Sequence, residues 1–156
     1  ADFNLPERFD LSYVSPENTM PRPVMLHRAI LGSVERFFGV LTEHVGGAFP
    51  TWLAPEQIAI ITVHESWDAW AKEAAALLRK AGIRVTVDLS NDKLGAKIKA
   101  ARNMRIPYRA VVGEKETSSR SLGLTVRDGN QELGAVPIDE VIARLRQESV
   151  APSFRS

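Results

Sequence analysis

Hydrophobic residues follow two different spacings over the second two thirds of the chain. The run 57–63 is β-branched and almost entirely apolar, which is typical of a strand buried on both faces. The run 66–81 carries apolar residues three and four positions apart, which predicts an amphipathic helix. Two further strands over 83–89 and 108–113, with a helix over 93–104 between them, complete a strand–helix–strand–helix–strand order. That order predicts an α/β fold with parallel strands joined by right-handed crossovers.

A hairpin and a closing helix are predicted after this unit. The strands 122–127 and 132–136 flank an Asp-Gly-Asn turn at 128–130. Apolar residues at helical spacing then mark the closing helix: Ile138, Val141, Ile142 and Leu145. We therefore expect a mixed sheet with helices on its faces over 51–150, followed by a frayed tail over 151–156.

The first fifty residues have a weaker pattern. A helix is predicted over 33–45, with Ser33 as its N-cap and Gly46-Gly47 as its stop. Before it, prolines separate three short segments that we expect to be extended: 2–5, 10–14 and 24–30. These strands have no partners of their own in this part of the sequence.

Charge is nearly balanced, with 20 Lys and Arg against 19 Asp and Glu in 156 residues. Binding to nucleic acid would therefore depend on local clustering. Such a cluster lies between positions 93 and 105, where five basic residues occur without an acid: Lys93, Lys97, Lys99, Arg102 and Arg105. It is either a phosphate-binding surface or an ordinary solvated helix face.

The chain has no cysteine, which excludes disulfides and thiolate zinc sites within it. No stretch of 18 uncharged apolar residues is present, and the first residues carry no signal-peptide pattern. We expect a cytoplasmic protein without a membrane span.

The segment 21–37 is the first candidate site. A predicted strand carrying His27 passes through Gly32 into a helix with Arg36 in its first turn. A metal ligand and a fixed positive charge would then lie near a helix N-terminus, where anions are favoured. The alternative is a histidine without a ligand role and a solvated arginine.

Three motifs carry a family resemblance. The string His27-Arg28-Ala29-(x)2-Gly32-Ser33-(x)-Glu35-Arg36-Phe37 resembles the third signature motif of class II aminoacyl-tRNA synthetases in its threonyl form. The string Gly-Ala-Phe-Pro-Thr-Trp-Leu-Ala-Pro at 47–55 resembles the junction between the catalytic and anticodon-binding domains of that family, and Asp2-Phe3-(x)-Leu5-Pro6-Glu7-Arg8-Phe9 also matches it. The resemblance covers nearly the whole chain and weakens in the hairpin and the tail.

The resemblance implies the C-terminal part of a threonyl-tRNA synthetase. Residues 1–50 would be the last strands and helix of the antiparallel catalytic domain, and 51–150 the anticodon-binding domain. His27 would be one of three zinc ligands, with the other two outside this chain. Arg36 would act catalytically and, with Ser33 and His27, bind ATP or substrate. The complete enzyme would be a homodimer that uses ATP with magnesium, and zinc, to join threonine to tRNA(Thr).

The resemblance also implies residues that contact the tRNA. Asn91 and Glu116 match residues that touch anticodon bases, and Lys93, Lys97 and Lys99 would bind the tRNA. One departure concerns Thr125, which stands where the family has an arginine that reads the middle anticodon guanine. Arg127, two positions on and expected on the same face, is the predicted substitute.

Two other hypotheses stay open at this point. The chain could be a stand-alone RNA-binding module in which His27 and Arg36 are relics, or an accessory or dimerising subunit without ligase activity. Because two zinc ligands and the motif that positions the tRNA acceptor end are missing, we expect the piece alone not to activate threonine.

Overall fold

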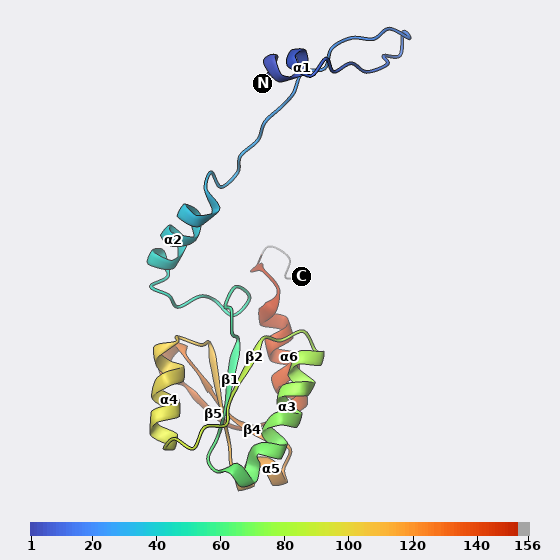
Figure 1. Cartoon of the computed structure of the whole chain (residues 1–156). Helices are drawn as coiled ribbons and strands as arrows, with labels where there is room; N and C mark the ends of the chain where they lie inside the picture. The colour runs from blue at the N-terminus through green and yellow to red at the C-terminus, as the bar shows by residue number, and fades with distance from the viewer. Residues whose placement is uncertain (153–156) are drawn as a thin grey trace. The chain divides into compact units, whose positions relative to one another are not determined.

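A computed structural model describes residues 1–152, and they form two compact units (Figure 1). The first unit comprises Ala1–Val40 and the second begins at Leu41. The expected fraying of the tail falls mainly on residues 153–156, which lie outside the described residues.

The second unit is built on one mixed sheet of five strands in the order β2-β1-β3-β4-β5. Strands β2 and β3 both run parallel to β1, whereas β4 is antiparallel to its neighbours β3 and β5. The strands are β1 (Ile58–Thr62), β2 (Val85–Asp88), β3 (Tyr108–Val112), β4 (Ser121–Val126) and β5 (Glu132–Pro137). The predicted α/β fold with a mixed sheet is confirmed.

Helices cover both faces of the sheet (Figure 1). Helices α3 and α6 pack on one face and α4 on the other. The helical elements of this unit are η1 (Glu65–Trp67), α3 (Asp68–Lys80), α4 (Leu94–Asn103), α5 (Glu114–Ser118), η2 (Asp128–Asn130) and α6 (Ile138–Ser149). The short helix α5 was not predicted, because its residues Glu-Lys-Glu-Thr-Ser carry no apolar stripe.

Strand β1 is buried on both faces. Ile58 and Ile60 belong to the core shared with α3 and α6, while Ala59 and Ile61 pack with residues of α4. Its neighbours β3 and β4 are covered by helices on the α3 side, where Leu124 is buried. On the opposite face, residues such as Gly123 and Thr125 are only partly buried, so part of this face is open.

Gln57 precedes β1 and is completely buried. Its side-chain amide donates to the Thr51 carbonyl (2.9 Å) and to Ser149 Oγ (2.7 Å). Its Oε1 accepts a hydrogen bond from the Arg84 amide (2.9 Å). One side chain therefore joins the segment before the sheet, the approach to β2 and the end of α6.

The first unit differs from expectation at its start. Residues Asn4–Arg8 form helix α1, so the prediction of an extended segment over 2–5 was wrong. The cause is the Asp2 carboxylate, which accepts hydrogen bonds from the amides of Asn4 (2.9 Å) and Leu5 (3.0 Å) as helix-capping side chains do.

The segments 10–14 and 24–30 are also not strands. They make a single bridge, between Asp2 and Met25, and a few isolated backbone hydrogen bonds such as Tyr13 to Pro21. The physical reason is that no neighbouring strand within residues 1–152 offers them a ladder.

The helix predicted over 33–45 is present as α2 (Val34–His44). Ser33 Oγ accepts from the Arg36 amide (3.2 Å), as an N-cap does. The chain then turns through Gly46 and Gly47 at φ values of 57° and 74°, and the Gly47 amide donates to the Thr42 carbonyl (2.9 Å). A side chain at either glycine would strain this backbone. No described helix has the length and apolar character needed to cross a bilayer.

We predict that Gln57→Leu lowers the free energy of unfolding by about 2–4 kcal/mol, because the buried partners of the lost amide are left without hydrogen bonds. Gln147→Leu, on an exposed position of α6, is the matched control and should change stability little. Urea denaturation followed by circular dichroism measures both. Equal stabilities of the two variants would contradict a structural role for the Gln57 amide.

Candidate nucleic-acid interface

A cleft lies at the edge of the sheet where β1 and β2 end. Its volume is about 340 Å³. Residues 63–65 follow β1, residues 90–92 follow β2, and together with Lys97 they line the cleft. Because β2 and β3 lie on opposite sides of β1, this is the edge at which ligands bind in open α/β sheets.

Asn91 lies exposed in the turn between β2 and α4. The turn is held by Asp88, whose Oδ1 accepts from the Ser90 amide (3.0 Å), and by the Ser90 hydroxyl, which donates to Asp92 (3.2 Å). The Asn91 amide is therefore presented by a backbone that its neighbours fix.

Lys97 differs from the other lysines of the basic cluster. It is 4% exposed, and its Nζ donates to the Thr62 carbonyl at the end of β1 (3.1 Å). Lys93 and Lys99, by contrast, are exposed. The ammonium of Lys97 thus belongs to the wall of the cleft, whereas the other two lie on the solvated surface of α4.

The pKa of Asp88 depends on burial, hydrogen bonds and charge beside the cleft. Partial burial disfavours its ionised form, but the Ser90 hydroxyl and amide and the Lys97 ammonium outweigh burial and hold the pKa of Asp88 below its ordinary value.

Glu116 lies in α5, the short helix that follows β3, and is partly buried. Its Oε2 accepts from the Gly113 amide (3.0 Å), which caps α5. A β carbon at Gly123 would lie 3.6 Å from Glu116 Oε1, so the carboxylate stands beside β4 on the open face of the sheet. A β carbon at Gly113 would also meet Val63 of the cleft wall at 3.7 Å. The structure therefore brings Glu116 to the same edge of the sheet as Asn91 and Lys97.

Arg127 lies at the other end of the sheet. Its amide donates to the Pro107 carbonyl, just before β3. Its guanidinium, in a side chain 16% exposed, donates to the carbonyls of Phe49 (2.8 Å) and Arg105 (3.0 Å) and pairs with Asp128 (2.8 Å). Arg127 follows the end of β4 at Val126, and it lines a cavity of about 440 Å³ with Arg105 and with Arg109, which pairs in register with Thr125.

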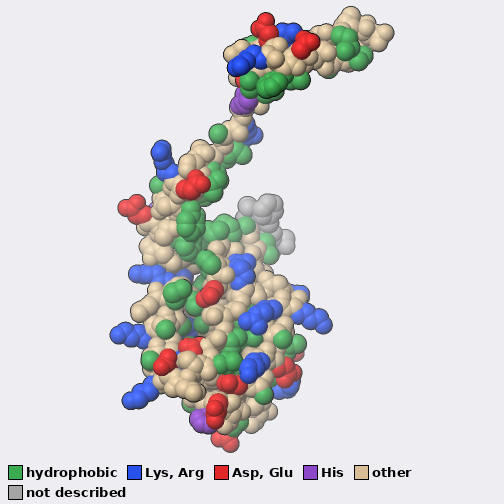
Figure 2. Space-filling view, viewed as in Figure 1, with side chains coloured by type: hydrophobic (Ala, Val, Ile, Leu, Met, Phe, Trp, Pro, Cys, Tyr) green, Lys and Arg blue, Asp and Glu red, His purple; other side chains and the backbone are tan. Residues whose placement is uncertain are grey.

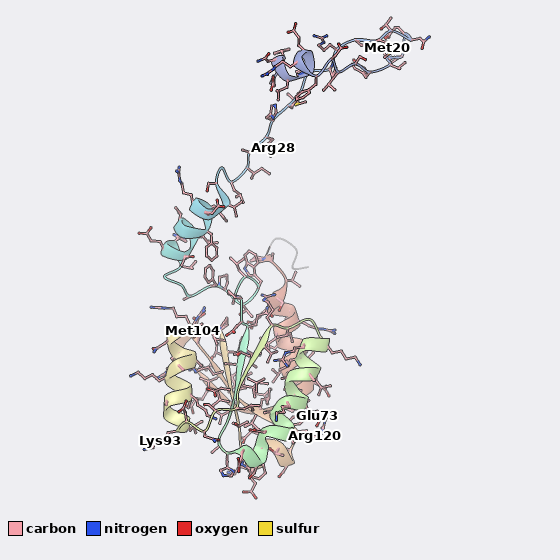
Figure 3. The ribbon with its side chains drawn as sticks, in the orientation of Figure 1. Met20, Arg28, Glu73, Lys93, Met104 and Arg120 are labelled. Atoms are coloured by element: carbon pink, nitrogen blue, oxygen red, sulfur yellow. The ribbon has the colours of Figure 1, made fainter. Side chains whose placement is uncertain are left out.

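Basic side chains project along the edge that α4 forms (Figure 2). Lys93 stands at the start of the helix and Met104 just after its end (Figure 3). Lys99 and Arg102 are exposed between them. The predicted cluster thus forms a basic edge, and its members Arg102 and Arg105 also line a cavity of about 440 Å³.

The predicted zinc ligand and ATP-binding residues of the first unit are His27, Ser33 and Arg36. His27 is exposed and in no strand, and its Nε2 lies 2.8 Å from the Asp2 carboxylate. The Leu5 amide, and to a smaller extent this imidazole, hold the pKa of Asp2 below its ordinary value. Ser33 donates to Glu35 (2.7 Å) and caps the helix that carries Arg36.

Zinc needs more ligands than this unit assembles. Among residues 1–152, no group of three His, Asp or Glu side chains is placed to hold a metal ion. The described residues alone therefore do not fit a zinc site.

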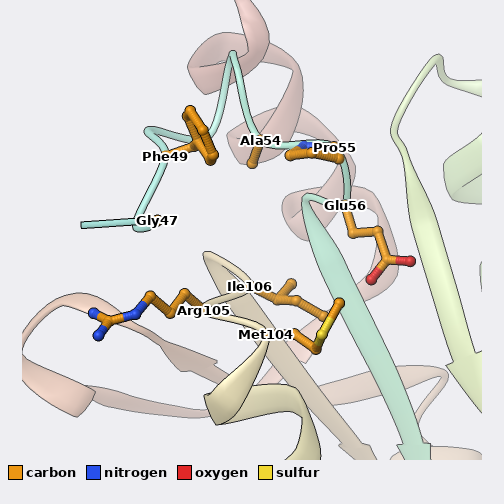
Figure 4. A pocket seen from close by; sticks show the side chains of 8 residues that line it. All are labelled: Gly47, Phe49, Ala54, Pro55, Glu56, Met104, Arg105 and Ile106. Atoms are coloured by element: carbon orange, nitrogen blue, oxygen red, sulfur yellow. The ribbon is translucent and has the colours of Figure 1, made fainter. Parts of the chain in front are cut away.

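A second cavity, of about 160 Å³, lies at the opposite edge of the sheet (Figure 4). Its walls are mostly apolar and include Phe49, Pro55, Met104 and Ile106. Of the predicted basic cluster, Arg105 lines it.

Residues 57–148 match the family described as "Anticodon binding domain". The chain belongs to this family.

Relatives named threonine–tRNA ligase resemble the whole chain. The protein of Oleidesulfovibrio alaskensis is 50% identical over 156 residues, covering 100% of this chain and 24% of its own length. That of Anaeromyxobacter dehalogenans strain 2CP-C is 50% identical over 151 residues, covering 97% of this chain and 23% of its own length. The chain thus spans about a quarter of these relatives.

Two solved structures are also similar to this chain. The RNA-binding domain of threonyl-tRNA synthetase from Cryptosporidium parvum Iowa II has a TM-score of 0.78 and 34% identity over 94% of this chain and 37% of its own. A prolyl-tRNA synthetase from Cryptosporidium parvum, at 20% identity and a TM-score of 0.62, shares the fold.

The anticodon-binding domain also contains a polar group that the sequence analysis missed. Arg109 is the second residue of β3 and 5% exposed, and its guanidinium donates to Asn130 Oδ1 (2.6 Å). Arg102 of α4 donates to the same oxygen (2.7 Å). An arginine inside an otherwise apolar strand, Tyr-Arg-Ala-Val-Val, is the signal that could have revealed it.

We predict that Lys97→Met raises the pKa of Asp88, because a nearby positive charge is lost, whereas Lys99→Met leaves it unchanged. In the wild type the lowered pKa adds stability at pH values above the ordinary 3.8, and this contribution is lost as the pH falls through the folded-state pKa. The Lys97 variant should therefore lose less stability on acidification. NMR titration of the Asp88 carboxyl carbon checks the shift, and identical values in both variants would place the ammonium outside the cleft.

Proposed function

We propose that the chain is the C-terminal part of a threonine–tRNA ligase and that its anticodon-binding domain holds the anticodon loop of tRNA(Thr). The observation that carries the proposal is the cleft at the carboxyl edge of β1 and β2, which Asn91 and Lys97 both line, in a member of this family. The names of the relatives at 50% identity support threonine as the amino acid.

The chemistry of the cleft suits a single-stranded RNA loop. Unstacked bases expose edges that an amide such as Asn91 or a carboxylate such as Glu116 can read. The exposed Lys93 and Lys99 lie where the backbone of the same RNA would pass, and lysines there would bind its phosphates. Buried Lys97 would act within the cleft, on a base carbonyl or a phosphate at its mouth.

Residues 1–50 would belong to the catalytic domain of the complete enzyme, with 51–150 as the anticodon-binding domain and 151–156 as a tail. In that enzyme Arg36 would act catalytically and, with Ser33, bind the ATP, which the enzyme uses with magnesium. His27 would add one ligand to a zinc site completed by residues outside this chain. We place the complete protein in the cytoplasm as a homodimer.

We predict that Glu116→Gln and Asn91→Ala each weaken binding of a threonine anticodon stem-loop by roughly 5- to 100-fold, the range expected for losing a base contact. Glutamine at 116 still accepts from the Gly113 amide, so α5 keeps its cap. Glu114→Gln, in the exposed first turn of α5, is the matched control. Fluorescence anisotropy measures the dissociation constants. The proposal fails if the wild type binds stem-loops of all anticodons equally well.

We predict that the 156-residue chain does not catalyse threonine-dependent ATP–pyrophosphate exchange. The chain contains no cysteine and gathers no three-ligand metal group within residues 1–152, so the zinc site of the complete enzyme cannot form from this piece. Exchange above the level without threonine would contradict this. Such a result would leave anticodon binding to be judged by the stem-loop measurement.

A further inference from the structure

A cavity of about 440 Å³ lies at the edge of the sheet opposite to the cleft that contains Asn91. Because β3 runs parallel to β1, the first residues of β3 lie at the edge away from the end of β1. Arg109, the second residue of β3, lines the cavity there. The described walls consist of four arginines and two asparagines, so they present positive charge and hydrogen-bond donors and no apolar residue. They are Arg102, Asn103, Arg105, Arg109, Arg127 and Asn130.

From this lining we infer that the cavity binds an oligophosphate, a small anion with two or more linked phosphate groups. Arginine suits phosphate because its planar guanidinium donates two parallel hydrogen bonds to neighbouring oxygens. The volume of about 440 Å³ lies in the range of small-molecule sites, roughly 300–1,000 Å³. The inference goes beyond the proposed function and does not depend on it, since the cavity and the cleft lie at opposite edges of the sheet.

Three of the four guanidinium groups have no acidic partner. Arg127 pairs with Asp128 (2.8 Å), which neutralises its charge. In the part of the chain that the structure describes, no carboxylate forms an ion pair with Arg102, Arg105 or Arg109. A ligand with several negative charges would neutralise this excess, whereas each phosphodiester of RNA carries a single charge.

Arg102 and Arg109 converge on one neutral oxygen. Asn130 Oδ1 accepts from Arg109 (2.6 Å) and from Arg102 (2.7 Å). Burial, and then the nearby charge of Arg102, lower the pKa of Arg109. Two positive charges brought together in this way repel each other, so an anion bound between them would be favourable. Glu132 lines the adjoining groove and not the cavity, so its carboxylate confines the anion to the cavity.

Arg109 keeps donors for a ligand. A guanidinium carries five N–H groups, and the printed bond of Arg109 to Asn130 uses its Nη2. Among residues 1–152, Asp68 Oδ1 alone is a buried side-chain nitrogen or oxygen without a hydrogen-bond partner. The Nε and Nη1 groups of Arg109 are therefore open to solvent. Because Asn130 fixes one end of the planar group, less entropy is lost when a ligand binds the other donors.

The end of α4 lies beside the cavity, and free carbonyl groups there would repel an anion. The carbonyl of Arg102 accepts from the Arg105 amide (2.9 Å), and that of Arg105 accepts from the Arg127 guanidinium (3.0 Å). These bonds reduce the negative charge of the helix end. The Arg105 guanidinium extends away from Met104 and Ile106, which line the neighbouring apolar cavity (Figure 4).

The test titrates the 156-residue chain with inorganic tripolyphosphate and, separately, with orthophosphate, in the absence of divalent cations. Isothermal titration calorimetry measures both dissociation constants. Tripolyphosphate should bind at least about tenfold more tightly, because it makes charge-assisted hydrogen bonds with more than one guanidinium at once. Equal affinities would overturn the assignment to an oligophosphate.

Two variants locate the site. Arg109→Met and Arg102→Met should each weaken tripolyphosphate binding roughly 10- to 100-fold, the range for losing a charge-assisted hydrogen bond. Arg102 is exposed, so its variant decides the question if Arg109→Met does not fold. Lys72→Met, at an exposed position of α3 on the other face of the sheet, also removes one positive charge and should keep the wild-type affinity. Equal weakening in all three variants would indicate general attraction to a positive surface and overturn the site.

A competition experiment distinguishes a small ligand from the backbone of bound RNA. Tripolyphosphate should shift the Arg109 Nε–H signal in NMR spectra. The shift should persist when the anticodon stem-loop of tRNA(Thr) is added in excess, because the stem-loop is expected at the opposite edge of the sheet. Displacement of tripolyphosphate by the stem-loop would identify RNA phosphates as the occupant and overturn a separate oligophosphate site.

Discussion

The burial of β1 on both faces is the constraint on which the anticodon-binding domain depends. Ile58 and Ile60 require α3 and α6 on one side, and Ala59 and Ile61 require α4 on the other. A strand that must be covered twice lies inside the sheet, so β2 and β3 take opposite sides of it. This arrangement brings the turns after β1 and β2 to one edge and creates the cleft there.

The same burial of β1 leaves the α4 face of the sheet only partly covered by helix. Helix α4 packs against β1, and β4 and β5 extend the sheet beyond it. Polar residues can therefore occupy positions such as Thr125 and Glu132 without being buried in a core. A cleft at the edge with an open sheet beside it follows from a helix layer that is narrower than the sheet.

Most strands and helices of the second unit were predicted from the sequence, because their apolar residues are spaced to pack in cores shared by distant elements. It failed where a local side chain decided the outcome. Asp2 caps α1 in a segment expected to be extended, and α5 has no apolar stripe. In the candidate site, the loop position of Asn91 was predictable, but the burial of Lys97 and the position of Arg109 beside Thr125 depend on tertiary packing and strand register, which one sequence does not reveal.

The hydrogen bonds around Gln57 have a consequence for the ends of the domain. Thr51 donates to Glu148 (2.9 Å), Tyr108 donates to the same carboxylate (2.7 Å), and Gln57 reaches Ser149. The segment that enters the domain is thereby anchored by the residues that close it. Truncating the protein within α6 would also release the segment that enters the domain, so loss of one end of the domain would destabilise the other.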